Sequence, residues 1–221
     1  MNQIIYPHAV IATDIVVFGI RNGELIVPLI GMKKEPFVGM RAIPGGLIKS
    51  DESVAMGAAR ILEEKTGVRG VYLEQLATFG AVDRDPFGRV VSVAYFALIS
   101  SDSHLKTTRE YSGIEWFSAV KPPKLAYDHA EILTTAIKRL RSKLSYTNIV
   151  YGLLPRRFTL SDLQKVYEII LAKKIDKRNF RKKILMLKLV KPTGENEGGT
   201  AHRPAKLYEF ILRKPREIEV I

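Results

Sequence analysis

A glycine turn followed by a long helical segment constrains this chain most strongly. Pro44-Gly45-Gly46 predicts a tight turn in which the backbone approaches a neighbouring segment closely. After the turn we expect a helix that begins near Ser50 or Asp51 and ends at Gly67. Three apolar residues at helical spacing predict that this helix packs against a sheet. They are Val54, Ala58 and Leu62.

The segment Gly46–Val68 resembles the Nudix box, a strand-loop-helix motif that cleaves nucleoside diphosphates linked to another group. Two positions depart from the family pattern, because Ile61 and Lys65 stand where the pattern has glutamate. The positions that fall in register are Gly46, Glu52, Arg60, Leu62, Glu64, Gly67 and Val68.

The two departures bear on magnesium binding, which the hydrolase chemistry of the motif requires. Magnesium prefers several oxygen ligands in octahedral geometry, and carboxylates three or four residues apart share one helix face. Here that face offers Ile61, Glu64 and Lys65, and an ammonium group repels a divalent cation. We therefore expect a retained scaffold with no metal site, no catalytic residue and no cofactor.

The rest of the first 150 residues predicts further strands. Asn22-Gly23 between two apolar, β-branched runs is a hairpin signal. The expected strands are Ile11–Ile20, Glu24–Gly31, Val71–Asp83, Val90–Ile99 and Ile114–Val120, with Val71–Asp83 and Val90–Ile99 forming an antiparallel pair.

A second helix is expected from Asp128 to Leu144. Asp128 has the spacing of an N-cap, with Glu131 completing a capping box and Tyr127 packing against Ile132. A catalytic dyad of Asp128 and His129 is the alternative. Capping is the preferred interpretation, because adjacent helix residues do not face each other.

Charge divides the chain unevenly. Residues 1–150 hold 18 Lys/Arg against 15 Asp/Glu, a net +3, whereas residues 151–221 hold 17 against 8, a net +9. A short, strongly basic segment suggests a polyanionic partner, and a solvated charged surface is the alternative. The stretch Ser145–Pro155 predicts a junction, so we expect domains at residues 1–148 and 149–221.

The basic segment has the order of a winged helix. Thr159 and Asp176 each have the position of a helix N-cap, and a glycine-containing loop and the strand Lys206–Leu212 follow. The second helix is the expected DNA reader, with Arg and Asn suited to base edges and Lys to phosphates. The candidate DNA-contacting residues are Thr159, Lys177, Arg178, Asn179, Arg181, Lys182, Arg203 and Lys206.

The degenerate box, the phrase FGAVDRDPFGRVVSVAY and the segment LPRRFTLSDLQKVYEIILAKKIDKRNFRKKI together resemble the Nudix-related transcriptional regulators, the NrtR family. The resemblance covers about residues 10–212. It implies an α+β chain in which a Nudix-like α/β/α sandwich is followed by a winged helix-turn-helix domain. It also implies a dimeric repressor that binds double-stranded operator DNA and senses ADP-ribose, a related NAD derivative or a sugar, commonly in NAD metabolism.

The resemblance places the effector where a hydrolase would hold its substrate. Arginine offers a planar fork for diphosphate oxygens, and Phe79 offers a ring for stacking. For Arg60, pairing with Glu52 or Glu64 is an equal alternative. The implied effector-binding residues are Arg41, Gly46, Arg60, Glu64, Phe79, Asp83, Arg84 and Arg89.

Composition narrows the remaining classes. The chain has no cysteine, which excludes disulfides and thiol catalysis, and no apolar run approaches the ~20 residues of a membrane span. We therefore expect a cytoplasmic protein. A hydrolase of ADP-ribose-like diphosphates, using Glu52 and Glu64, is the alternative function. A nonspecific nucleic-acid-binding protein is a third reading, which only the charge supports.

Overall fold

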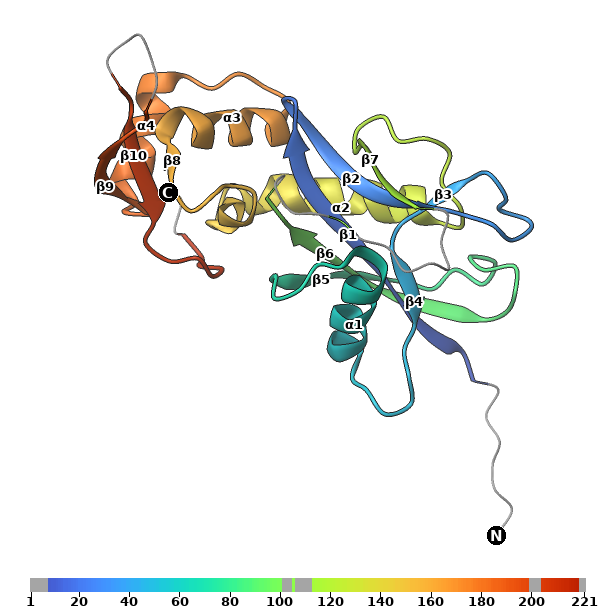
Figure 1. Cartoon of the computed structure of the whole chain (residues 1–221). Coiled ribbons are helices and arrows are strands. Elements are labelled where there is room, and N and C mark those ends of the chain that lie inside the picture. The colour runs from blue at the N-terminus through green and yellow to red at the C-terminus, as the bar shows by residue number, and fades with distance from the viewer. Residues whose placement is uncertain (1–7, 101–104, 106–112, 199–203, 219–221) are drawn as a thin grey trace.

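The structure is a computed structural model that describes residues 8–100, 105, 113–198 and 204–218. Figure 1 shows a larger N-terminal part, in which a sheet lies between two helices, and a smaller C-terminal part beside it. The strands of the larger part are β1 (Val10–Arg21), β2 (Glu24–Gly31), β3 (Arg41–Ala42), β4 (Gly45–Leu47), β5 (Leu73–Phe79), β6 (Val90–Leu98) and β7 (Ile114–Ser118). Its helices are α1 (Val54–Thr66) and α2 (His129–Lys143).

Strand β1 lies at the centre of the sheet, whose main path runs β3-β2-β1-β6-β5. Successive side chains of a strand point to opposite faces. Val16 and Phe18 enter the larger hydrophobic core with α2, whereas Ile15 and Val17 enter a second core with α1. The continuous apolar run in the sequence therefore reflects burial on both faces.

The predicted hairpin is confirmed. β1 and β2 pair antiparallel, with Arg21 opposite Glu24, and Asn22 and Gly23 both have positive φ angles, of 52° and 77°. The antiparallel pairing of β5 with β6 is also confirmed. β1 and β6 run parallel, which places the start of β6 next to the start of β1.

Helix α1 begins later than the sequence predicts. Its N-cap is Ser53, whose hydroxyl accepts a hydrogen bond from the backbone N–H of Met56. The carboxylate of Glu52 instead accepts a hydrogen bond from the backbone N–H of Lys49, which holds the preceding loop in place. Gly67 ends the helix in the left-handed conformation, as the sequence predicts.

The C-terminal part has the element order of a winged helix. It comprises η1 (Ile149–Gly152), β8 (Phe158–Thr159), α3 (Leu160–Leu171), α4 (Lys177–Met186), β9 (Val190–Asn196) and β10 (Lys206–Phe210). Its three strands have the order β8-β10-β9. Asp176 caps α4, as predicted, by accepting a hydrogen bond from the backbone N–H of Asn179 at 2.8 Å.

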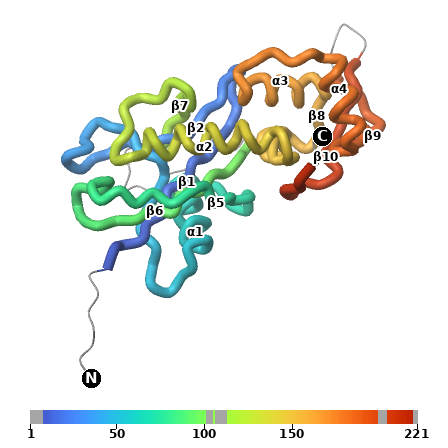
Figure 2. The backbone as a smooth tube through the Cα atoms, turned by 180° about the vertical axis from the view of Figure 1, so that it is seen from behind, coloured from blue at the N-terminus to red at the C-terminus, as the bar shows by residue number. Residues whose placement is uncertain are grey.

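The two parts are closely packed at their junction. Figures 1 and 2 show the tip of the β1–β2 hairpin beside α3. The guanidinium of Arg141 on α2 donates to the carbonyl oxygen of Ile170 on α3 at 2.9 Å. Leu140 and Ile170 belong to one continuous core. Because the core does not break there, the boundary at residues 148 and 149 stays a prediction.

The helices in the described ranges are all too short or too polar to cross a membrane.

Candidate functional site

A cavity of about 220 Å³ opens between β1, the glycine turn and the start of α2. Its wall is mostly apolar, and its polar groups come from Asp14, Arg84, Asp85, Tyr127 and His129. The remaining lining residues are Ala12, Ile30, Met32, Ala42, Ile43, Gly45, Gly46, Leu47 and Val90.

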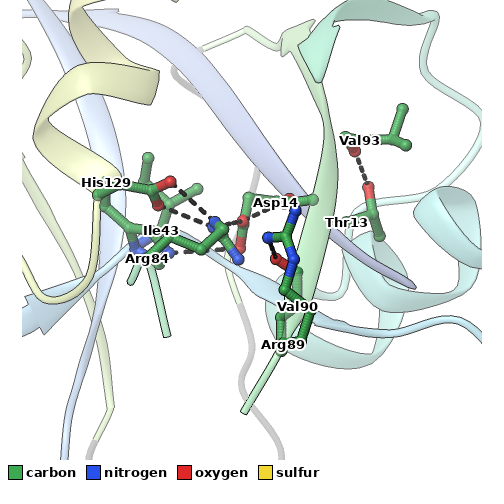
Figure 3. A network of polar contacts seen from close by, with 10 residues as sticks. Thr13, Asp14, Ile43, Arg84, Arg89, Val90, Val93 and His129 are labelled. Carbon is green, nitrogen blue, oxygen red and sulfur yellow. Dashed lines mark hydrogen bonds and ion pairs between the residues drawn. The ribbon is translucent and has the colours of Figure 1, made fainter. Parts of the chain in front are cut away.

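The floor of this cavity is a buried ionic network. Arg84 donates to both carboxylate oxygens of Asp128, at 2.8 Å each, and to Oδ2 of Asp14 at 3.2 Å. The same Asp14 oxygen accepts a hydrogen bond of 2.6 Å from the hydroxyl of Ser92. Figure 3 shows Arg84 lying between Asp14 and the start of α2. The side chain of Arg84 is only 3% exposed, so its guanidinium is held almost entirely within this network.

His129 closes the other side of the network. Its Nδ1 accepts a hydrogen bond of 2.9 Å from the backbone N–H of Ile43, so in the neutral ring Nε2 carries the proton. Nε2 lies 3.4 Å from Oδ1 of Asp14. The strand–turn segment around Ile43 and the start of α2 are therefore joined to Asp14 through one imidazole.

The network keeps its charged groups ionised in spite of burial. Burial works against the charge of Asp14, but His129, Ser92 and Arg84 outweigh it and hold the pKa of this carboxyl below its ordinary value. Burial likewise opposes the charge of Arg84, but the hydrogen bonds that Arg84 donates to Asp128 and Asp14, and the negative charges of these two carboxylates, raise the pKa of the guanidinium above its ordinary value.

The predicted capping role of Asp128 is wrong. Asp128 stands at the N-cap position of α2, but its side chain makes no capping hydrogen bond because its carboxylate binds Arg84. Tyr127, with φ of 54°, turns the chain sharply before the helix. As a result Asp128 and His129 both contact the Asp14–Arg84 network, although adjacent helical residues would point apart.

The glycine turn makes this packing possible. A Cβ atom on Gly45 would lie 2.0 Å from Oδ1 of Asp14, which no side chain tolerates. Only glycine lets β4 approach β1 at the point where Asp14 is opposite Gly45. This agrees with the close approach that the sequence predicts for the turn.

On the outer surface of α1, the guanidinium of Arg60 binds both carboxylates that the box retains. It donates to Oε2 of Glu52 at 2.9 Å and to Oε2 of Glu64 at 3.0 Å. The pairing of Arg60 that the sequence offers as an alternative to effector binding is thus present, with both Glu52 and Glu64. The hydrogen bonds from Arg60 lower the pKa of Glu52 to about 2.

Ile61 and Lys65, the two departures from the box, differ in how deeply α1 buries them. Ile61 is 1% exposed, belongs to the core between α1 and the sheet, and would lie 3.2 Å from a Cβ on Gly46. Lys65 is half-buried in the last turn of the helix. The helix therefore turns an aliphatic side chain toward the sheet at one position where the family pattern has a glutamate.

The structure brings only Gly46 and Arg84 of the predicted effector residues to the cavity wall. Arg41 pairs with Glu115 at 3.1 Å, and Arg89 donates to the carbonyl oxygens of Gly80 and Ala81. Phe79 is 8% exposed within the larger core, so its ring is not presented for stacking. Asp83 is exposed in the turn before Arg84. Arg60 and Glu64 lie on α1 outside the lining of the cavity.

The first turns of α4 present an exposed basic surface. Lys177, Arg178, Asn179 and Lys182 are exposed, and in the described part of the chain none of the three cations makes an ion pair. Lys206 is exposed at the start of β10. These predicted DNA-contacting residues thus lie on solvent-facing surfaces of the smaller part.

Thr159 and Arg181 have internal roles instead. Thr159 is 5% exposed and forms a capping box with Asp162 at the start of α3. Arg181 is half-buried and donates to the hydroxyl of Ser161 at 3.0 Å, which links α4 to α3. Both side chains thus have partners within the smaller part, and their assignment as DNA contacts stays a prediction. Arg203 lies outside the described residues.

Two family models match the chain. The NUDIX domain matches residues 10–136, and the NrtR DNA-binding winged helix domain matches residues 150–210. Over 212 residues the chain is 36% identical to the ADPR responsive transcriptional repressor NtrR of Acinetobacter baylyi. This match covers 94% of this chain and 84% of the relative. The chain belongs to the NrtR family.

Solved structures of an NrtR-family protein have the same fold. The structure of Shewanella oneidensis NrtR with a 27mer DNA superimposes with a TM-score of 0.76 at 33% identity, covering 90% of this chain and 93% of that one. The NUDIX domain of the same protein with ADP ribose matches with a TM-score of 0.55 at 33% identity, covering 61% of this chain and 90% of that domain. The predicted fold class is thereby confirmed.

In this NrtR-family chain, sequence reasoning missed Asp14 and Tyr127. Asp14 carried a usable signal, since a single carboxylate inside an apolar strand needs a buried partner. Tyr127 carried none, because its place beside the cavity depends on a left-handed backbone conformation that tyrosine rarely adopts. For His129 the sequence suggests only the dyad with Asp128.

Proposed function

We propose that this protein is a DNA-binding transcriptional repressor whose Nudix-like domain binds ADP-ribose or a related NAD derivative. The observation that carries the proposal is the match to an ADPR responsive repressor over 94% of this chain, together with the cavity and the exposed basic helix that this chain has. The protein would act as a homodimer in the cytoplasm and present two α4 helices to half-sites about 34 Å apart.

The charge of the cavity suggests which end of the effector enters it. Arg84 is shared between Asp14 and Asp128, and Asp85 adds a further carboxylate to the lining. A diphosphate would meet this acidic environment unfavourably, whereas ribose hydroxyls can donate hydrogen bonds to carboxylates. We place a ribose inside and the diphosphate at the mouth, near Arg89.

The same domain is proposed to bind its ligand without cleaving it. Ile61 supplies no oxygen, and Arg60 neutralises Glu52 and Glu64, the two carboxylates that the box retains. Magnesium would have to displace Arg60 to reach them. A residual hydrolase activity is the competing function, and it predicts turnover that depends on magnesium and disappears with Glu64→Gln.

An electrophoretic mobility shift on DNA from upstream of the gene tests the proposal. We expect a sequence-specific complex that weakens when ADP-ribose is added, with an affinity that falls as salt rises. Tyr127→Ala should remove the response to ADP-ribose and leave DNA binding intact. The matched control is Phe87→Ala, an exposed aromatic outside the cavity lining.

Two results would contradict the proposal. Binding that is indifferent to DNA sequence would leave only a basic surface with no specific operator. Rapid release of AMP from ADP-ribose in the presence of magnesium, without any effect of ADP-ribose on a DNA complex, would favour the hydrolase.

A further inference from the structure

A second cavity, of about 550 Å³, lies at the junction of the two parts and is separate from the effector cavity. Its floor is the end of β6, one side is the segment before β5, and the other side is η1 with the chain after β10. The lining includes Tyr72, Tyr151, Gly152, Arg213 and Lys214. Ligand sites of this size often lie between domains.

The chain after β10 is fixed at this junction by Asn148. Its side-chain amide donates to the carbonyl oxygens of Leu212 and Lys214, at 3.2 and 3.1 Å, and its carbonyl accepts from the backbone N–H of Arg216 at 2.7 Å. Gly152 packs so tightly on β6 that an added Cβ would lie 2.9 Å from Leu98. The wall of the cavity is therefore built by the fold rather than by loosely held side chains.

Among the described residues, the cavity carries positive charge that no carboxylate neutralises. Arg213 donates to the backbone carbonyls of Tyr151, Leu154 and Pro155, at 2.7 to 3.1 Å, which orients its guanidinium without a carboxylate. Neither Arg213 nor Lys214 makes an ion pair within the described ranges, and no acidic residue lines the cavity. Burial lowers the pKa of Arg213, as expected for a cation that lacks an anionic partner.

Two tyrosines complete the lining. The Tyr151 side chain is held against Phe210, and its hydroxyl has no hydrogen-bond partner among the described residues. Tyr72 is 43% exposed and offers a ring to an organic group. Its hydroxyl lies 3.5 Å from Glu74, but that carboxylate is paired with Lys143 at 2.9 Å.

We propose that this junction cavity is a second binding site, for an organic phosphate of nucleotide size. The phosphate would contact Arg213, Lys214 and the hydroxyl of Tyr151, and the organic part would lie along β6 and Tyr72. β6 also reaches the effector cavity through Val90, about 26 Å away at the rise of an extended strand. A ligand here would touch both parts of the protein and fix their relative position.

The test uses the full-length protein with AMP, pyrophosphate and adenosine as probes, followed by hydrogen exchange and calorimetry. We expect AMP to bind and to protect residues 149–152 and 213–215 from exchange, pyrophosphate to bind more weakly at the same place, and adenosine not to bind. Lys214→Glu should raise the Kd for AMP about tenfold and Tyr151→Phe several-fold. Lys121→Gln is the matched control and should leave the Kd unchanged.

Several outcomes would overturn the second site. AMP protection confined to residues 84–90 and 127–132 would place AMP only in the effector cavity. Protection confined to residues 177–183 would mean that phosphate binds the basic helix. Equal binding of adenosine and AMP, or a Kd that is unaffected by both Lys214→Glu and Tyr151→Phe, would remove the phosphate from the junction. None of these results bears on the repressor function, which the mobility shift tests separately.

Discussion

Charged residues around the effector cavity and those on α4 differ in where their partners lie. In the cavity, Arg84 is nearly fully buried and shares two carboxylates, and every member of the network is bonded to another. On α4, Lys177, Arg178 and Lys182 are exposed and lack ion pairs among the described residues. The first arrangement is a preformed site whose charged groups bind one another, whereas the second requires an external polyanion to neutralise it. This difference can be tested by removing one charge from each.

The largest effect is expected for Arg84→Ala. The substitution leaves Asp14 and Asp128 buried beside each other without their cation, which should destabilise the fold by about 3–5 kcal/mol. Urea denaturation measures the loss. Arg69→Ala is the matched control, because that exposed ion pair with Glu63 should contribute at most about 1 kcal/mol. Equal losses of unfolding free energy in the two variants would show that Arg84 contributes no more to stability than an exposed ion pair does.

On α4, the effect should appear in binding rather than in folding. Arg178→Ala should weaken specific operator binding by about 1–3 kcal/mol, with a smaller loss for unrelated DNA. Lys182→Ala should weaken both by similar amounts and reduce the salt dependence by about one phosphate contact. Titrations at several salt concentrations separate the two. If Arg178→Ala also lowered binding to all DNA equally, Arg178 would be a phosphate contact.

Thr159→Ala tests whether Thr159 stabilises the winged helix or contacts DNA. Loss of the capping box should cost about 1 kcal/mol of stability, because Thr159 and Asp162 satisfy the first turn of α3. The salt dependence of DNA binding should not change. A reduced salt slope at unchanged stability would restore Thr159 as a DNA contact.

Local patterns predicted the fold well, because apolar runs, turn glycines and caps are encoded within a few residues. Asn22-Gly23, Gly67 and Asp176 each had the predicted role. The site was harder to predict, because its contacts join residues far apart in sequence. Arg84 lies 70 residues from Asp14 and 44 from Asp128, and no local spacing encodes those pairs. The sequence around Asp128 has a strong capping pattern, but in the structure its carboxylate binds the buried guanidinium of Arg84 instead of capping α2.

The smallest effect is expected for the pH dependence of the unfolding free energy that Glu52 causes. It probes the charges of the box itself. In the folded protein the hydrogen bonds from Arg60 lower the pKa of Glu52 from 4.5 to about 2. A carboxyl with a depressed folded-state pKa stabilises the fold above its unfolded pKa, and this contribution is lost as pH falls from about 4.5 toward 2. Glu52→Gln should therefore reduce the slope of the unfolding free energy against pH in that window. The reduction should correspond to a change of up to about one in the number of protons bound on unfolding.

Asp51→Asn, at an exposed neighbouring residue, is the control and should leave the slope as in the parent protein. An identical slope for Glu52→Gln and the parent would mean that Arg60 does not hold Glu52 in solution. The retained carboxylates of the box would then be accessible to a cation.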